Sequence, residues 1–341
     1  MTSRSATFTL LVFSAATFGL LSLFVPRLAS AGNLENLMAG YSFVAILAAG
    51  QSFPILLRGI DLSIGAIVAL AGMVTFDLLL IFHVPGWLVI PAALATATLA
   101  GAFNGVLIVG LRLQPFIATL ATLGAYRGLV FTISGRQRVP GLSTTPIRDP
   151  WITGLEHYID LGAALGVPDD VRLPAVPLSF FVMIGLLVLG HLLLTTTRFG
   201  RDVYAVGGNH EAARLAGIPT GRITIAAYAI SGLCAGAAAL FLVARLTTST
   251  EALGTGMELT AIAAAVIGGV SLAGGIGSVI GPAIGAFLLG TILIGLALLG
   301  VSQFVQQILT GLILLAAIAY DRLQVLRRRT QRSAHHGQLR H

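Results

Sequence analysis

The chain has 341 residues, of which 56% are hydrophobic and only 10% are charged, and its formal net charge is +7. Long apolar runs recur along its length, and this composition excludes a soluble globular protein. The chain has no lysine, so arginine supplies all of its fixed positive charge. Arginines that flank apolar runs are typical of membrane topology signals rather than of nucleic-acid binding.

The apolar runs predict an all-α polytopic membrane protein with about ten transmembrane helices. Residues 1–341 form one transmembrane domain, which is embedded in the membrane over about residues 6–320. The predicted spans are 6–25, 36–57, 62–82, 87–110, 114–134, 175–195, 222–243, 258–273, 277–299 and 302–320. The apolar core of the first span is too long for a signal peptide, so we expect a retained helix. The span at 258–273 is short and rich in glycine, and a re-entrant or irregular segment is the alternative.

Arginine placement orients these spans. Thirteen arginines fall on the side that carries both termini and six on the other, which makes the first side cytoplasmic. The outer side then holds one long extracytoplasmic loop, 135–174, whose prolines and acidic residues suit a docking partner. The basic tail, 321–341, is expected to be cytoplasmic and disordered.

Residues 59–65 read Gly-Ile-Asp-Leu-Ser-Ile-Gly and lie between two apolar runs. An acid beside hydrocarbon is costly, so Asp61 needs a structural or functional reason to be there. The two glycines allow the backbone to turn, and Asp61 and Ser63 can then cap the helix that follows. A broken helix beside a buried acid is also how transporters build a substrate path. Both interpretations stay open.

A second segment resembles the first one. Residues 59–72 and 256–269 align without gaps, and the alignment pairs Asp61 with Glu258 and Ser63 with Thr260. Five spans in each half would relate the halves by inverted topology, so we predict two inverted five-helix halves. Chance similarity in a chain rich in Gly, Ala and Leu is the alternative.

The connector at 198–222 is the most polar cytoplasmic segment between two spans. Asn209 is a good N-cap, Glu211 suits the first turn of a helix, and Gly217 is a good stop signal. These signals predict a helix of about two turns over 210–216. Its apolar contacts would be Ala212, Ala213, Leu215 and Ala216. A helix this short must pack against something, either its own spans or a cytoplasmic partner.

Four segments together resemble the membrane permease of bacterial ABC sugar importers, the group that takes up ribose, xylose, galactose or galactofuranose. They are GIDLSIG at 59–65, PFIATLAT at 115–122, RFGRDVYAVGGNHEAARLAGI at 198–218, and ELTAIAAAVIGGVSLAGGIGSVIG at 258–281. The family often has two glycines before the Ile-Asp pair, and here Arg58 replaces the first of them.

The resemblance implies an importer of a small neutral sugar in the bacterial cytoplasmic (inner) membrane. Its partners would be a cytoplasmic ABC ATPase, an extracytoplasmic sugar-binding protein and a second permease, identical or paralogous. The family's coupling segment corresponds to residues 198–217. The expected ATPase-coupling residues are Asn209, Glu211, Ala212, Arg214, Leu215 and Gly217.

A neutral polyol needs hydrogen-bonding side chains and apolar walls rather than a dense charge cluster. The candidates for the substrate path are Gln51, Asp61, Ser63, Asn104, Gln114, Phe116, Thr119, Glu258, Thr260 and Ser271. The chain has no Walker A sequence, so the ATPase must be another subunit and no cofactor is expected. A permease for branched-chain amino acids or nucleosides is the alternative within the class. An intramembrane enzyme would need a paired catalytic set, and the sequence offers none.

Overall fold

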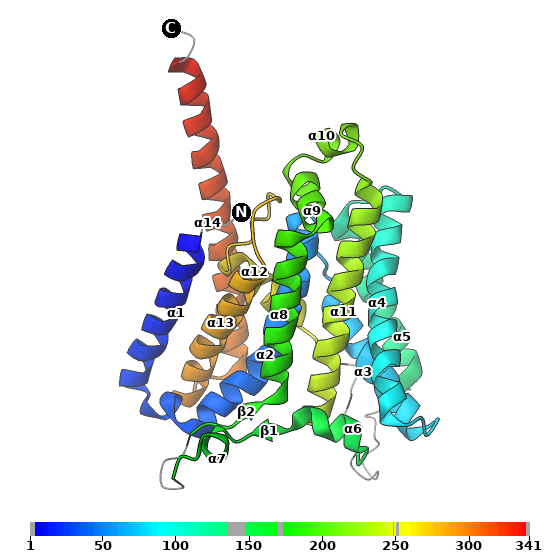
Figure 1. The fold of residues 1–341 in the computed structure, drawn as a ribbon, viewed down its shortest axis with the longest axis vertical. Helices are drawn as coiled ribbons and strands as arrows, with labels where there is room; N and C mark the ends of the chain where they lie inside the picture. The colour runs from blue at the N-terminus through cyan, green and yellow to red at the C-terminus, as the bar shows by residue number, and fades with distance from the viewer. Residues whose placement is uncertain (1–3, 135–146, 169–172, 248, 250–251, 339–341) are drawn as a thin grey trace.

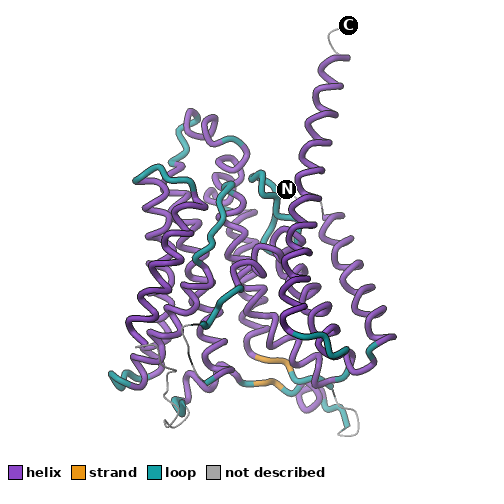
Figure 2. Tube along the Cα trace, turned by 180° about the vertical axis from the view of Figure 1, so that it is seen from behind, coloured by secondary structure: helices purple, strands orange, loops and turns teal. Residues whose placement is uncertain are grey.

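Helices run in both directions between the two ends of the molecule (Figures 1 and 2). The computed structural model describes residues 4–134, 147–168, 173–247, 249 and 252–338. The elements up to residue 134 are α1 (Arg4–Phe24), η1 (Pro26–Ala29), α2 (Ala31–Leu56), α3 (Ile64–Leu80), α4 (Gly86–Gly110) and α5 (Pro115–Ser134). The next are α6 (Pro150–Thr153), η2 (Gly154–Glu156), β1 (Tyr158–Ile159), α7 (Leu161–Leu165), β2 (Val176–Pro177) and α8 (Leu178–Thr196). The last are α9 (Arg198–Gly208), α10 (His210–Leu215), α11 (Thr220–Leu246), α12 (Met257–Ile267), α13 (Ile280–Leu298) and α14 (Gln303–Gln338).

A helix occupies each of the predicted spans. Eight helices of the described chain are long and apolar enough to cross a membrane, namely α1, α2, α4, α5, α8, α11, α13 and α14. The all-α polytopic membrane fold predicted from the sequence is therefore confirmed. The two shorter apolar helices are α3, with 17 residues, and α12, with 11 residues.

The expected span at 258–273 is wrong in its second half. Helix α12 ends at Ile267, and the chain continues through turns to the start of α13. Eleven residues of helix rise only about 16 Å, roughly half of a hydrocarbon core. Gly268 and Gly269 follow α12 directly, and the positive φ of 86° at Gly269 ends the helix. The segment is therefore a half-helix followed by an irregular connector, as the alternative interpretation expected.

The tail also differs from expectation. Helix α14 continues to Gln338, so most of the tail at 321–341 is helical rather than disordered. Arginine, glutamine, leucine and alanine are good helix formers and dominate this stretch, and the apolar part of α14 provides a ready nucleus. α1 begins, and α14 ends, on the side of the molecule where α10 lies (Figure 1). We call this side the α10 end and the opposite side the α6 end.

Helices α2 and α11 form the centre of the bundle. α11 packs along α4, α2 and α3, and α2 also packs against α13, α12 and α8. Small residues let α4 and α11 come close: a methyl group on Gly232 would lie 2.2 Å from the Ala97 carbonyl oxygen, and one on Gly101 would lie 2.2 Å from that of Tyr228. Close approach at small residues is the usual basis of helix packing in membranes.

The α6 end carries an ordered cover of short elements. Strands β1 and β2 pair antiparallel, with Tyr158 opposite Pro177. The Asp149 carboxylate accepts the Trp151 and Ile152 N–H groups and thereby caps α6. Arg245 at the end of α11 lies 3.8 Å from the Glu156 carboxylate. Residues 135–146 and 169–172 of the predicted long loop lie outside the described residues.

Candidate functional site

The chain turns back into the bundle between α2 and α3. Arg58 lies in this turn with a φ of 65°, in the left-handed region that glycine adopts at little cost. The Arg58 guanidinium donates hydrogen bonds to the Gly207 carbonyl, at 2.7 Å, and to the Gly208 carbonyl, both at the end of α9. The turn is thereby fixed to the α10 end.

Asp61 lies fully buried just before α3 and is the centre of a polar cluster. One of its carboxylate oxygens accepts the Ser63 N–H at 3.0 Å and the Ser63 hydroxyl at 2.7 Å. The Ser231 hydroxyl of α11 donates to the other oxygen at 3.0 Å. Ser63 makes no side-chain cap of α3, so the cap predicted for it is wrong. Its hydroxyl is instead one of the donors to Asp61, and Asp61 shapes the turn that precedes the helix.

Two further side chains close this cluster. Asn104 of α4 donates to the Ser63 hydroxyl at 2.7 Å and lies 3.5 Å from the Asp61 carboxylate. The Tyr126 hydroxyl of α5 lies 3.2 Å from the Asn104 side-chain oxygen and donates to the Ala100 carbonyl at 2.8 Å. The cluster therefore joins α3, α4, α5 and α11. A buried polar network is stable only when its members are satisfied, and the Asp61 carboxylate meets that condition.

Glu258 lies at the start of α12, directly against the start of α3. A methyl group on Gly65 would lie 2.3 Å from Oε2 of Glu258 and 2.4 Å from the Gly254 carbonyl oxygen. Oε1 of Glu258 accepts the Gly256 N–H at 3.3 Å, whereas Oε2 is buried and accepts no hydrogen bond from the described residues. Arg127 of α5 donates to the Leu253 carbonyl at 2.6 Å and interacts electrostatically with Glu258.

Helices α3 and α12 both begin inside the bundle, and we call these two short helices the half-helices. They run in opposite directions from this meeting point. α3 leads towards the α6 end, where Asp149 accepts the Gly86 N–H at the start of α4. α12 leads towards the α10 end, where the connector after it donates from the Gly275 N–H to the Leu56 carbonyl. These directions agree with the inverted repeat predicted from the sequence. The helix starts are not equivalent, because α12 begins four aligned positions earlier than α3.

Two other predicted path residues, Thr119 and Thr260, lie at these helices, and a third, Gln51, lies in α2. The Thr119 hydroxyl of α5 donates to the Ile60 carbonyl at 3.0 Å, beside Asp61. The Thr260 hydroxyl of α12 donates to the Gly256 carbonyl at 3.2 Å. Gln51 of α2 is fully buried, and neither polar atom of its side chain has a hydrogen-bond partner among the described residues. A buried amide without partners is costly, which makes Gln51 a candidate to bind something the chain does not supply.

The structure does not bring the remaining candidates into the same cluster. Ser271 is buried in the connector after α12, where its hydroxyl oxygen accepts the Ala273 N–H at 3.3 Å. Gln114 is exposed in the turn before α5, and Phe116 is 52% exposed on the outer face of α5. These three belong to the α10 end or to the outer surface of the bundle.

Sequence reasoning missed two members of the Asp61 cluster. Ser231 lies within an apolar run of α11 beside Gly232, and Tyr126 lies in α5 beside Arg127. A single hydroxyl in an apolar helix is ordinarily a helix-packing residue, so no local pattern marks either one. Their shared partners appear only when four helices are brought together.

Helix α9 forms the first part of the polar connector and was not predicted. The Thr197 hydroxyl caps it by accepting the Gly200 N–H at 3.2 Å. Val203 and Val206 are buried against the end of α2. The Tyr204 hydroxyl donates to the Gly277 carbonyl at 2.9 Å, and burial raises the pKa of this side chain. α9 is therefore a fixed base at the α10 end of the bundle.

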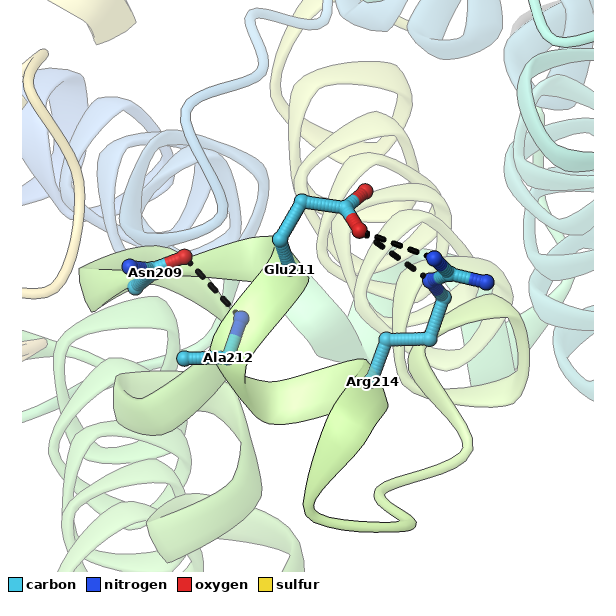
Figure 3. A network of polar contacts seen from close by, with 4 residues as sticks. All are labelled: Asn209, Glu211, Ala212 and Arg214. Carbon is cyan, nitrogen blue, oxygen red and sulfur yellow. Dashed lines mark hydrogen bonds and ion pairs between the residues drawn. The ribbon is translucent and has the colours of Figure 1, made fainter.

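Helix α10 rises from that base (Figures 1 and 3). The Asn209 side-chain oxygen accepts the Ala212 N–H at 3.1 Å, so the predicted N-cap forms. Figure 3 also shows the Arg214 guanidinium directed at the Glu211 carboxylate, at 3.0 Å. Both side chains are largely exposed, so this ion pair contributes little stability. The helix spans residues 210–215 within the predicted 210–216.

The apolar side chains of α10 mostly face away from the protein. Ala213 alone of the four expected contact residues is buried, whereas Leu215 is 82% exposed. Of the two alternatives, packing of all four residues on the chain's own spans is therefore excluded. Gly217, with a φ of 80°, turns the chain towards α11 as predicted. The exposed face of α10 is therefore left free for a contact outside this chain, the second of the two alternatives.

A bundle of apolar helices around two half-helices and a buried polar centre defines a polytopic membrane permease, a transport component rather than an enzyme. The family model described as branched-chain amino acid transport system / permease component matches residues 33–318, and the chain belongs to this family.

Curated relatives cover almost the whole chain. The ribose import permease protein RbsC of Escherichia coli (strain K12) is 38% identical over 296 residues, which is 87% of each chain. The L-arabinose transport system permease protein AraH of the same organism is 35% identical over 321 residues, 94% of this chain and 92% of the relative. The D-allose transport system permease protein AlsC of that organism is 35% identical over 322 residues, with the same coverage. No solved structure matches the chain.

Proposed function

We propose that this chain is the permease subunit of an ATP-driven importer that carries a small neutral sugar, a pentose or a hexose, into the cytoplasm. The observation that carries the proposal is the set of relatives named for ribose, L-arabinose and D-allose, which match 87–94% of the chain. The family description names branched-chain amino acids, but the full-length relatives favour a sugar. The polar centre agrees with this choice, since hydroxyl and amide groups surround Asp61.

The substrate path is proposed to pass the meeting point of α3 and α12. Both half-helices begin inside the bundle, and the N-terminus of a broken helix is where transporters commonly place polar ligand contacts. The unpartnered amide of Gln51 and the unpartnered oxygen of Glu258 are the groups that a sugar hydroxyl could satisfy. Asp61, Ser63, Asn104, Thr119 and Thr260 would hold the surrounding backbone, while Gln114, Phe116 and Ser271 would lie towards the exit.

The partners follow from the two ends of the molecule. We assign the α10 end to the cytoplasm of a bacterial inner membrane, because the arginine-rich side of the chain lies there. α10 would dock on a cytoplasmic ABC ATPase, with Asn209, Ala212 and Gly217 fixing the helix and Glu211, Arg214 and Leu215 facing the partner. The ordered cover at the α6 end would receive a sugar-binding protein. A second permease would complete the assembly.

Competition for uptake tests the substrate class. Cells that express this permease with its ATPase and binding protein are given radiolabelled ribose, arabinose or allose. We expect saturable uptake of at least one sugar, competed by the same unlabelled sugar and unaffected by excess leucine. Uptake of labelled leucine, with no uptake of any sugar, would instead support the amino-acid alternative and overturn the proposal.

A further inference from the structure

A cavity of about 730 Å³ opens at the α10 end of the bundle. It lies between the end of α4, the turn before α3, helix α10 and the start of α11. Its charged and polar lining includes Arg58, Arg112, Arg214, His210, Glu211 and Tyr228. The volume falls within the range of about 300–1,000 Å³ that is typical of small-molecule sites.

The charge in this cavity is unbalanced in favour of cations. Three arginines face one carboxylate, and that carboxylate, Glu211, already pairs with Arg214. The Arg112 guanidinium makes no hydrogen bond or ion pair with any residue that the structure describes. Arg58 and Arg112 both have left-handed backbones, with φ of 65° and 53°. Such conformations are unfavourable for side-chain-bearing residues and concentrate at functional sites.

Two uncharged donors face the same space. The Tyr228 side chain is only 1% exposed, and its hydroxyl has no hydrogen-bond partner among the described residues. The start of α11 carries no side-chain cap, and its first residues, Thr220 and Gly221, line the cavity. Free N–H groups at the start of a long helix favour anions. A buried hydroxyl donor, an uncapped helix start and the unpaired guanidinium of Arg112 thus converge in one cavity.

We propose that this cavity binds the phosphate group of a sugar-sized organic phosphate. Arginine forks and helix N-termini are the donors that phosphate oxygens prefer, and both occur here. The remaining volume, walled by Ile108, Val109 and Leu113, leaves room for a small body attached to the phosphate. A neutral sugar without phosphate has no use for an unpaired arginine such as Arg112, so the chemistry of this site differs from that of the substrate path.

The site also contacts α10, because Glu211 and Arg214 form part of its wall. A bound phosphate would compete with Glu211 for Arg214 and so change the surface that α10 presents. A cytoplasmic phosphorylated sugar could thereby regulate import. This consequence rests on the proposed function, whereas the binding site itself does not.

Direct binding to the full-length permease tests the site without its ATPase. The protein is placed in nanodiscs of phosphatidylcholine, and ribose 5-phosphate, inorganic phosphate and ribose are titrated by calorimetry. We expect saturable binding of ribose 5-phosphate that ribose does not displace. Arg112→Gln should weaken it at least about tenfold, the loss typical of one charge-assisted contact, while Arg222→Gln, an exposed arginine outside the cavity, should not.

A second set of nanodiscs distinguishes a lipid headgroup from a free phosphate. They contain phosphatidylglycerol, and the thermal unfolding of the protein is compared with that in phosphatidylcholine. Stabilisation by phosphatidylglycerol that disappears in Arg112→Gln, without binding of ribose 5-phosphate, would assign the site to a lipid phosphate and overturn the soluble ligand. If neither ligand shows a dependence on Arg112, the cavity is not an anion site. If the wild-type protein takes up no sugar in cells but still binds ribose 5-phosphate, that result would count against the proposed function alone.

Discussion

The Asp61 carboxylate stabilises its surroundings because its oxygens accept the hydrogen bonds of Ser63 and Ser231. Asp61→Ala would leave the Ser63 N–H and the hydroxyls of Ser63 and Ser231 buried without their acceptor, at a cost of about 1–3 kcal/mol. Asp61→Asn keeps one acceptor oxygen, so its loss should be smaller. Thermal unfolding of the purified variants in detergent measures both. An Asp61→Ala protein as stable as the wild type would contradict the structural role. Normal sugar uptake by Asp61→Asn would show that the path does not need the charge.

Gly65 is the point where the two half-helices touch. Gly65→Ala should lower the unfolding temperature and impair uptake, since the new methyl group would meet both Glu258 and the Gly254 backbone. Gly124→Ala on α5 is the matched control, because a methyl group there meets nothing within 4 Å. Adding Glu258→Ala should not rescue Gly65→Ala, as the backbone contact remains. Equal stability of the two glycine variants would show that α3 and α12 are not in close contact.

The sequence identified individual residues best where local chemistry made them unusual. Asp61 and Glu258 stand out as acids in apolar runs, and both lie at the starts of half-helices. Ser231 and Tyr126 carry no such signal, because their partners come from helices far apart in the chain. Local pattern also could not show that Phe116 lies on an outer face, since every face of a membrane helix is apolar.

Helix α10 has few contacts of its own, so its role can be removed without harming the fold. Glu211→Arg combined with Leu215→Asp should leave membrane insertion intact and abolish sugar-stimulated ATP hydrolysis. The first substitution reverses a charge on α10, and the second replaces its exposed apolar side chain with a charged one. Leu299→Asp is the control: its side chain is 59% exposed at the end of α13, on the opposite side of the molecule. Coupling as strong as in the wild type would place the docking surface elsewhere.

Short elements were predictable where their capping signals were present. Asn209, Glu211 and Gly217 defined α10 almost to the residue. α9 escaped prediction because Gly200, Gly207 and Gly208 have low intrinsic helix propensity, whereas burial of its valines, which stabilises the helix, cannot be seen in the sequence. Likewise the apolar composition of 258–273 did not show where α12 ends, since the connector that follows is buried by tertiary contacts.

The orientation of the whole molecule can be read from single cysteines. The native Cys234 is buried, so it should give little background with a membrane-impermeant maleimide. Trp151→Cys, 57% exposed at the α6 end, should label in intact spheroplasts. Leu215→Cys, at the α10 end, should label only after the membrane is permeabilised. Labelling of both sites from outside would contradict the predicted topology and the inverted arrangement of the two halves.

At the scale of the whole chain, the apolar spans were the most predictable feature. Apolar length alone locates a membrane helix, because hydrocarbon tolerates so few backbone arrangements. The packing order of the helices was not predictable, as it depends on small-residue contacts such as Gly101 with α11. The cavity at the α10 end was equally hidden, since its arginines come from three segments that are far apart in the chain.

Reconstituted transport tests the central claim most directly. The permease and its ATPase are placed in proteoliposomes that contain ATP, and the binding protein and radiolabelled sugar are added outside. We predict that sugar accumulates inside only when ATP, the binding protein and the wild-type permease are all present. Accumulation that persists without ATP, or ATP hydrolysis that never responds to any sugar-loaded binding protein, would contradict the account of this chain as a sugar-importing permease.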